Sequence, residues 1–177
     1  MNLFEKLTDK AGPLRLRFLV IGGHAVNFHG FQRGTEDADI LICRSDAETW
    51  RELIPGMGFR LVHEQETFLQ FGSLDSAEWD LDLMIVPAET FERLFAAAEA
   101  DGPADKPVRY VSFENLIALK AHALKHGQGL RSLKDLTDVA TLLKLRNVSP
   151  EAAWLRAVFQ RNGTPEMHER IRKLVTE

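Results

Sequence analysis

The sequence contains a single cysteine, Cys43, so no disulfide can form within the chain. This composition fits a reducing compartment without requiring one. No apolar run approaches the roughly 20 residues of a membrane span, and the first residues lack the basic start and apolar core of a signal peptide. We therefore expect a cytoplasmic protein with no membrane partner.

The chain also lacks a large excess of charge of one sign, because its formal net charge is only -4. A value this small gives no whole-chain attraction to nucleic acid, although basic residues do gather near the C-terminus. The 177 residues are enough to bury a core as one domain or two small lobes. Composition thus neither requires nor excludes an RNA substrate.

The first part of the chain has the pattern of strands joined by short turns and helices. Residues 14–22 alternate and then become continuously apolar, which predicts a strand that ends at Gly22-Gly23. A short helix up to Gly30 follows, and residues 37–42 predict the next strand. Three further strand-like runs have short connections, which favour antiparallel pairing; they cover residues 59–64, 68–73 and 79–86.

The second part of the chain is predicted to be helical. Residues 88–100 have helical spacing, residues 108–112 fit one last edge strand, and helix starts follow one another from Ser112. We therefore predict an α/β (α+β) protein with a mixed sheet flanked by helices over residues 1–111. A C-terminal helical lobe would cover residues 112–177.

Two aspartates open the second strand and point to the same face of it. Side chains two residues apart share a face, so Asp37 and Asp39 lie opposite Ala38, Ile40 and Ile42. Two carboxylates this close repel unless a cation or protons intervene. Mg²⁺ would relieve the repulsion, since it takes oxygen ligands and combines carboxylates with substrate phosphates. The structural alternative is a pair of solvated aspartates at the mouth of a strand.

A second pair, Asp80 and Asp82, repeats this arrangement on a later strand. If the two strands are neighbours, a third carboxylate meets the first pair. Three carboxylates suffice for two metal ions about 3.5–4 Å apart, the arrangement used in phosphoryl transfer. We expect Asp82, deeper in the apolar run, to be the third ligand, with Asp80 as the alternative.

The segment before Asp37 has features of a phosphate site. Gly22 and Gly23 allow a backbone turn to approach an anion closely. Arg33 and Thr35 lie in the loop before the aspartates, where the first would contact phosphate and the second a metal-bound oxygen. As structural residues, Thr35 would serve the turn and Arg33 would pair with a neighbouring carboxylate.

These residues together resemble the nucleotidyltransferase fold shared with DNA polymerase beta. The resemblance is closer to small bacterial nucleotidyltransferases that include the abortive-infection toxins of type IV toxin–antitoxin systems. The matching signatures are Gly22, Gly23 and Ala25, then Arg33, Thr35, Asp37 and Asp39, then Leu81-Asp82-Leu83. The resemblance extends through helical segments to about residue 145, whereas residues 149–177 carry no signature.

The resemblance implies transfer of a nucleoside monophosphate from a nucleoside triphosphate to an acceptor, with pyrophosphate leaving. Asp37 and Asp39 would hold Mg²⁺ or Mn²⁺, and Asp82 would share one metal ion and help to deprotonate the acceptor hydroxyl. Gly22 and Gly23 would receive the triphosphate. The acceptor stays open among RNA, protein and small molecules, and a cognate antitoxin is an implied partner.

Two other residues enter through the resemblance. Lys120 would neutralise triphosphate charge, although an ordinary helix lysine would also fit its position. Many members of the wider fold carry Ser after the first glycine, where this chain has Gly23 followed by His24. The phosphate contact then falls to backbone amides or to His24.

Two other functions compete with this interpretation. One is a non-catalytic module of the same fold that binds a nucleotide or a partner. The other is a nucleotide-sugar glycosyltransferase that uses Asp37 and Asp39 for its metal, although that fold normally needs a larger doubly wound domain. In the helical lobe, Asp135 is expected in a capping box with Ser132 and in a surface pair with Arg131. Asp138 is expected in a surface pair with Lys134.

Overall fold

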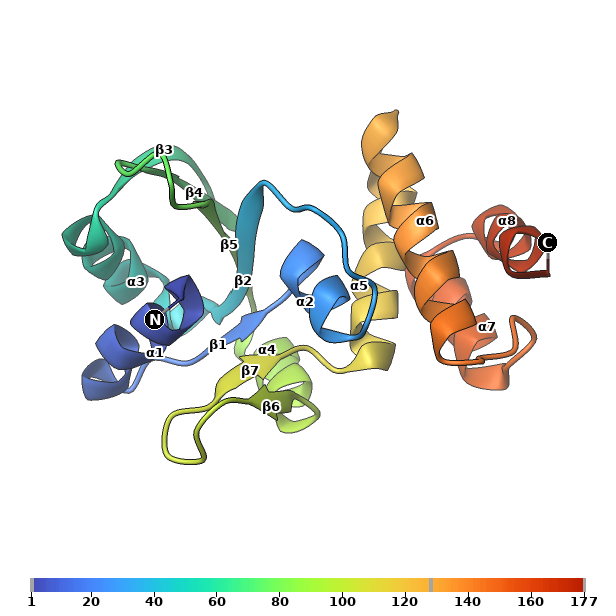
Figure 1. Cartoon of the computed structure of the whole chain (residues 1–177), viewed down its shortest axis with the longest axis horizontal. Helices are drawn as coiled ribbons and strands as arrows, with labels where there is room; N and C mark the ends of the chain where they lie inside the picture. The colour runs from blue at the N-terminus through green and yellow to red at the C-terminus, as the bar shows by residue number, and fades with distance from the viewer. Residues whose placement is uncertain (1, 128, 177) are drawn as a thin grey trace. The chain divides into compact units, whose positions relative to one another are not determined.

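The computed structural model describes residues 2–127 and 129–176, and Figure 1 shows the whole chain. The chain divides into two compact units. The first consists of residues 1–25 and 33–112, and the second of residues 26–32 and 113–177. Residues 26–32, which the sequence pattern places in the α/β core, thus cluster with the helical unit. No helix of the described residues is long and apolar enough to cross a membrane.

A mixed sheet of seven strands, counted over the described residues, forms the centre of the first unit. The strands are β1 (Phe18–Val20), β2 (Asp37–Cys43), β3 (Phe59–Gln65), β4 (Phe68–Ser73), β5 (Asp80–Val86), β6 (Glu99–Asp101) and β7 (Val108–Tyr110). Their order is β3-β4-β5-β2-β1-β7-β6. Two neighbouring pairs, β2 with β5 and β1 with β7, are parallel, and the others are antiparallel. The predicted mixed α/β sheet and the antiparallel β3-β4-β5 order are confirmed.

Eight α-helices are found in the described residues. They are α1 (Leu3–Ala11), α2 (Gly22–Phe28), α3 (Ala47–Leu53), α4 (Ala88–Ala96), α5 (Phe113–His126), α6 (Leu130–Leu145), α7 (Ala153–Asn162) and α8 (Pro165–Thr176). The first helix, α1, was not predicted from the sequence. A capping box begins this helix, because the Asn2 side chain accepts from the Glu5 amide and the Glu5 carboxylate accepts from the Asn2 amide.

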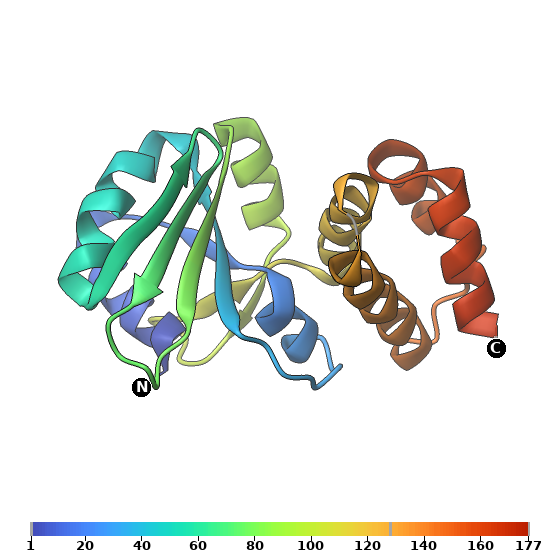
Figure 2. The ribbon, with the colours of Figure 1, turned by 90° about the horizontal axis from the view of Figure 1, so that it is seen from above.

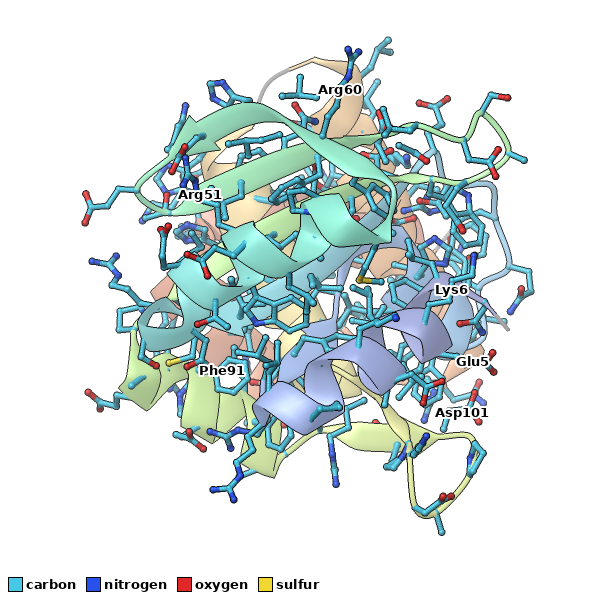
Figure 3. The ribbon with its side chains drawn as sticks, turned by 90° about the vertical axis from the view of Figure 1, so that its left-hand side faces the viewer. Glu5, Lys6, Arg51, Arg60, Phe91 and Asp101 are labelled. Carbon is cyan, nitrogen blue, oxygen red and sulfur yellow. The ribbon has the colours of Figure 1, made fainter. Side chains whose placement is uncertain are left out.

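One face of the sheet is covered by α1 and α3, which lie in front of the strands in Figure 3. Strand alternation sends Ala38, Ile40 and Ile42 of β2 into this core, where each is fully buried. Burial of each isoleucine stabilises the unit by roughly 1.5–3 kcal/mol. The opposite face of β2, which carries the aspartates, packs against α4 farther along the strand.

The strands β6 and β7 differ from the prediction. The expected helix over residues 88–100 ends at Ala96, and residues 99–101 form β6, which pairs with β7. The strand β7 is therefore an interior strand between β1 and β6 rather than an edge. All three residues of β6 are exposed, so strand pairing rather than burial of its side chains determines its conformation.

The second unit is a cluster of helices. In it α5 packs against α6 and α7, and α8 packs against α6 and α7. Buried leucine and aromatic side chains, including Leu116, Leu143, Leu155 and Phe159, fill the space among these helices. These helices thus form a packed unit with its own core.

Candidate metal and nucleotide site

The site is formed where the parallel strands β2 and β5 begin. In their register Asp37 is paired with Asp80 and Asp39 with Asp82. Carboxylate oxygens of Asp37, Asp39 and Asp82 all lie within 4.8 Å of one another. The predicted proximity of these three residues therefore exists in the structure, because the parallel register places Asp82 directly beside Asp39.

Asp80, the alternative third carboxylate, makes a different contact. It is exposed, and its Oδ1 accepts a hydrogen bond from the Ser73 amide at 2.8 Å. This contact joins the end of β4 to the start of β5 across the hairpin connection. Asp80 therefore has a structural role that is independent of the carboxylate cluster.

The carboxylate cluster has the chemistry and size for a hard divalent cation. Its donors are oxygens, which Mg²⁺ and Mn²⁺ prefer. An octahedral Mg²⁺ holds opposite ligands about 4.2 Å apart, twice its metal–oxygen distance of roughly 2.1 Å. The 4.8 Å spread is slightly larger, so a small side-chain adjustment would bring the three carboxylates onto one cation. The residues present thus fit a metal centre.

Gly22 lies directly against this cluster, and Gly23 lies against the loop before β2. The backbone of Gly22 has a φ of +60°, and a Cβ at this position would be 1.9 Å from Asp39 Oδ2. A Cβ at Gly23 would be 2.5 Å from Thr35 Oγ1 and 3.2 Å from Arg33 Nη1. No side chain therefore fits at either position without displacing a neighbour, and the backbone of this turn closely approaches the carboxylates.

The loop before β2 is held by hydrogen bonds between its own residues and the start of the strand. Thr35 Oγ1 donates to the carbonyl oxygen of Asp37 at 3.2 Å, and Arg33 donates to the carbonyl oxygen of Gly34 at 2.9 Å. These contacts, with those to Gly23, place Arg33 and Thr35 beside the glycine turn and the first aspartate. The structure thus brings both of these sequence-predicted residues to the site.

His24 packs among aromatic rings. Its ring centroid lies 4.9 Å from that of Phe4 and 4.4 Å from that of Trp79, both in edge-to-face geometry. Burial lowers the pKa of His24, and the charge of Arg33 lowers it further, while Asp37 acts in the opposite direction. The lowered pKa favours the neutral form of His24, whose ring packs against Phe4 and Trp79 directly after the glycine turn.

Lys120 belongs to the helical unit, where it is buried. Its Nζ lies 2.7 Å from Asp135 Oδ1 and 2.7 Å from Asp138 Oδ2, so one lysine on α5 holds two aspartates of α6. The expected surface pair of Asp138 with Lys134 is wrong, because Asp138 is only 1% exposed and binds Lys120. Asp135 is also buried, which contradicts its expected surface position. The expected capping box of Asp135 with Ser132 is wrong as well, because α6 begins at Leu130 with Gly129 as its N-cap residue and no side-chain cap.

Gln70, which was not predicted as a site residue, lies next to the aspartates in the sheet. In the antiparallel pair β4 and β5, Gln70 is the direct partner of Asp82 and lies on its other side from Asp39. A lone glutamine in a strand gives no sequence signal of this proximity. Only the strand register identifies Gln70 as a neighbour of the carboxylates.

The fold is found in known nucleotidyltransferases. The structure of ANT(2″)-Ia in complex with adenylyl-2″-tobramycin aligns with a TM-score of 0.61 at 17% identity, over 90% of this chain and 96% of that chain. The lincomycin-bound lincosamide antibiotic adenylyltransferase LnuA aligns with a TM-score of 0.56 at 13% identity, over 77% and 94% of the two chains. An antigenic nucleotidyltransferase-like protein from Paracoccidioides brasiliensis gives a TM-score of 0.57 at 15% identity, over 96% and 90%. At these identities the likeness establishes the fold.

The family is established by the sequence itself. The comparison with curated proteins gives no match. A family model described as nucleotidyl transferase AbiEii toxin, Type IV TA system, matches residues 7–177. This match covers nearly the whole chain and confirms the resemblance seen in the glycine and aspartate signatures. The chain therefore belongs to the AbiEii family of nucleotidyl transferase toxins of the Type IV toxin–antitoxin systems.

Proposed function

We propose that this chain transfers a nucleoside monophosphate from a nucleoside triphosphate to an acceptor hydroxyl, using Mg²⁺ or Mn²⁺ at Asp37, Asp39 and Asp82. The observation that carries the proposal is the cluster of three carboxylates within 4.8 Å, directly against the Gly22 backbone. A nucleotidyltransferase of this family needs such a cluster beside a surface that a triphosphate can approach closely. A cytoplasmic location stays a prediction of the sequence.

The reaction assigns separate tasks to the side chains. The acceptor oxygen attacks the α-phosphorus, a new P–O bond forms, and the bond to the departing pyrophosphate breaks. Asp82, on the strand next to Asp39, accepts the proton of the acceptor hydroxyl. A cation held by the three carboxylates would neutralise charge on the phosphates and on the leaving group.

The glycine turn and its loop orient the triphosphate. Because neither Gly22 nor Gly23 carries a side chain, their amides are open to phosphate oxygens at close range. Arg33, beside Gly23, adds a positive charge to the same surface, and Thr35 fixes the loop by its bond to the Asp37 carbonyl. Triphosphate contact by Lys120 stays a prediction; such a contact would require Lys120 to exchange its buried carboxylate partners.

The test is a transfer assay on the full chain. Purified protein is incubated with each of the four labelled nucleoside triphosphates, Mg²⁺ or Mn²⁺, and either total RNA or a protein extract. We expect label transfer that Asp37→Asn/Asp39→Asn abolishes together with Mn²⁺ binding, because the cluster loses two anionic ligands. Asp80→Asn is the matched control, since this exposed aspartate accepts from the Ser73 amide of the hairpin, is not part of the carboxylate cluster and should preserve transfer.

Each alternative predicts a different result. Nucleotide binding without transfer for any base would favour a non-catalytic module of the same fold. Transfer that survives the double substitution would reject the site assignment. Recovery of label in RNA, protein or a small molecule would identify the acceptor class, and co-purification tests of the neighbouring gene product would address the antitoxin partner that the family implies.

A further inference from the structure

Three rings pack together beside the glycine turn. The ring of His24, the residue directly after Gly23, lies 4.9 Å from that of Phe4 and 4.4 Å from that of Trp79 between centroids. The planes of the two pairs meet at 78° and 69°, so both have the edge-to-face geometry that aromatic rings prefer. We call Phe4, His24 and Trp79 the aromatic triad.

The aromatic triad joins three segments that lie far apart in the sequence. Phe4 belongs to α1 and is buried in the hydrophobic core of the first unit. His24 lies in the first turn of α2, and Figure 2 shows β1 leading directly into this helix. Trp79 directly precedes β5, the strand that carries Asp82. The ring of His24 therefore ties the start of α2 both to the core and to the segment before β5.

The segment before β5 is itself held on both sides of Trp79. Lys6 Nζ of α1 donates to Glu78 Oε2 at 2.7 Å, and the Ser73 amide donates to Asp80 Oδ1 at 2.8 Å. These contacts fix the residue before Trp79 and the residue after it. The indole thus projects from a backbone that is anchored to α1 and to the end of β4.

The glycine turn has a second attachment, on the side of the sheet. The Ile21 amide donates to the carbonyl oxygen of Asp39 at 3.0 Å, which joins the residue before the turn to β2. Gly22 and Gly23 have no side chain with which to hold the turn in place. His24 carries the first side chain after the glycines, so its ring contacts act on the turn over the shortest stretch of chain.

The ring of His24, rather than its nitrogen atoms, makes the contacts to the other two segments. Its Nε2 is buried and has no hydrogen-bond partner among the residues that the structure describes. Both of its ring neighbours are aromatic side chains, and a phenyl ring would make the same edge-to-face contacts. The shape of the His24 side chain therefore matters at this position more than its hydrogen bonding.

We propose that His24 and Trp79 are positioning residues of the nucleotide site, whose ring contact holds the first turn of α2 so that the amides of Gly22 and Gly23 face the triphosphate. The proposal rests on the proposed function, because it takes the glycine turn as the triphosphate site. The carboxylates are held by the pairing of β2 with β5 and not by this contact. Loss of the ring contact therefore weakens triphosphate binding and leaves metal binding unchanged.

A binding experiment tests the aromatic triad without relying on transfer. The full chain, which has 12 glycines, is labelled with ¹⁵N-glycine and titrated in an NMR experiment with inorganic triphosphate and Mg²⁺. We expect the amide signals of Gly22 and Gly23, assigned by substitution, to shift in the wild-type protein. Trp79→Ala should raise the dissociation constant of inorganic triphosphate by about two- to tenfold, the loss expected for one aromatic pair.

Matched variants separate the ring contact from other effects. Trp79→Phe and His24→Phe keep a ring at each position, so both should bind inorganic triphosphate within about twofold of the wild-type affinity. A tenfold loss in His24→Phe would show that a nitrogen of His24 contacts the phosphate and would overturn the proposal. Leu74→Ala shortens an exposed side chain in the same connection between β4 and β5, and this control should leave the affinity unchanged.

A double-mutant cycle tests whether the two residues act together. Because His24→Ala and Trp79→Ala remove the same contact, the double variant should lose no more affinity than the weaker-binding single variant. Additive losses would show that each residue acts separately and would overturn the proposal. Mn²⁺ affinity, measured by electron paramagnetic resonance, should stay within about twofold in all three variants, and a parallel loss of Mn²⁺ affinity would contradict a role limited to the glycine turn.

The two proposals fail in different ways. Wild-type transfer with a triphosphate affinity that Trp79→Ala does not change would reject the role of the aromatic triad and leave the transfer reaction standing. Shifts of Gly22 and Gly23 that weaken in Trp79→Ala, in a protein that transfers no nucleotide, would preserve the role of the triad and reject the proposed reaction. No shift of either glycine in the wild-type protein would reject the triphosphate site and the role of the triad with it.

Discussion

Replacing Gly22 by alanine should damage the metal site more than the fold. The Gly22 backbone has a φ of +60°, a conformation that L residues adopt at a cost of about 1–2 kcal/mol. The new Cβ would also be 1.9 Å from Asp39 Oδ2, a distance that real Cβ contacts do not reach. The Asp39 carboxylate must therefore move by more than about 1 Å, whereas metal–ligand distances tolerate only about 0.2 Å.

The magnitude follows from these two effects. Backbone strain of about 1–2 kcal/mol lowers the melting temperature of a chain of this size by roughly 2–8 °C. Changes that misplace a ligand's support typically lower metal affinity by about 10- to 100-fold, and we expect Gly22→Ala to fall in this range for Mn²⁺. Transfer activity should fall with the loss of bound metal.

Two measurements separate strain from displacement of the carboxylate. Electron paramagnetic resonance counts free Mn²⁺ during a titration, and thermal unfolding is followed with and without Mn²⁺. At a concentration about 100 times its dissociation constant, the ion should stabilise the wild-type protein by about 2.7 kcal/mol, and this increment should shrink in Gly22→Ala.

Gly58→Ala is the matched control. Gly58 also has a positive φ, +92°, but a Cβ there would meet nothing within 4 Å. It should lose stability by a similar amount and keep its Mn²⁺ affinity. Gly22→Ala with wild-type Mn²⁺ affinity, or Gly58→Ala with an equal loss of affinity, would refute the reasoning.

Two further predictions concern buried charge. Lys120→Met removes the cation between two buried carboxylates and should destabilise the protein by about 3–5 kcal/mol in chemical denaturation. Lys125→Met, a substitution at an exposed position on the same helix, should have little effect. Equal stability of the two variants would contradict a structural role for the ion pairs. Burial lowers the pKa of His24 below 6.5, so the unfolded chain binds this proton more readily and His24 weakens the fold as the pH falls below about 6.5. The free energy of unfolding of the wild type minus that of His24→Gln should therefore decrease between pH 7.5 and pH 5, and a constant difference would show that His24 is not responsible.

The sequence was sufficient to predict the parts of the site that depend on alternation. Residues 37–42 alternate between aspartates and apolar residues at their start. Burying the apolar side of this strand therefore turns Asp37 and Asp39 away from the core. The same pattern at residues 80–85 predicts the second strand. Neither pattern states which strands pair or in what register, and it is the parallel pairing of Asp39 with Asp82 that selects Asp82 for the cluster.

Other features of the structure could not be predicted from local sequence patterns, for physical reasons. Lys120, Asp135 and Asp138 have the spacing of ordinary helix-surface residues, and only the packing of α5 on α6 buries them together. The strand β6 has an acidic sequence with little strand propensity and exists through its pairing with β7. By contrast, α1 carries a visible capping box at Asn2 and Glu5, so its omission from the prediction reflects an overlooked signal.

The position of the carboxylates is determined by the core rather than by the carboxylates themselves. Because side chains alternate, a slip of β2 by one residue would turn Asp37 and Asp39 into the core beneath α1 and α3 and move Ile40 and Ile42 out of it. Burial of the two isoleucines alone is worth roughly 3–6 kcal/mol, which is comparable to the stability of a whole domain. The apolar side of the strand therefore holds the register against the mutual repulsion of the acidic side. A metal ion would find its ligands already aligned, and the stability that aligns them would persist when the ion or the substrate leaves.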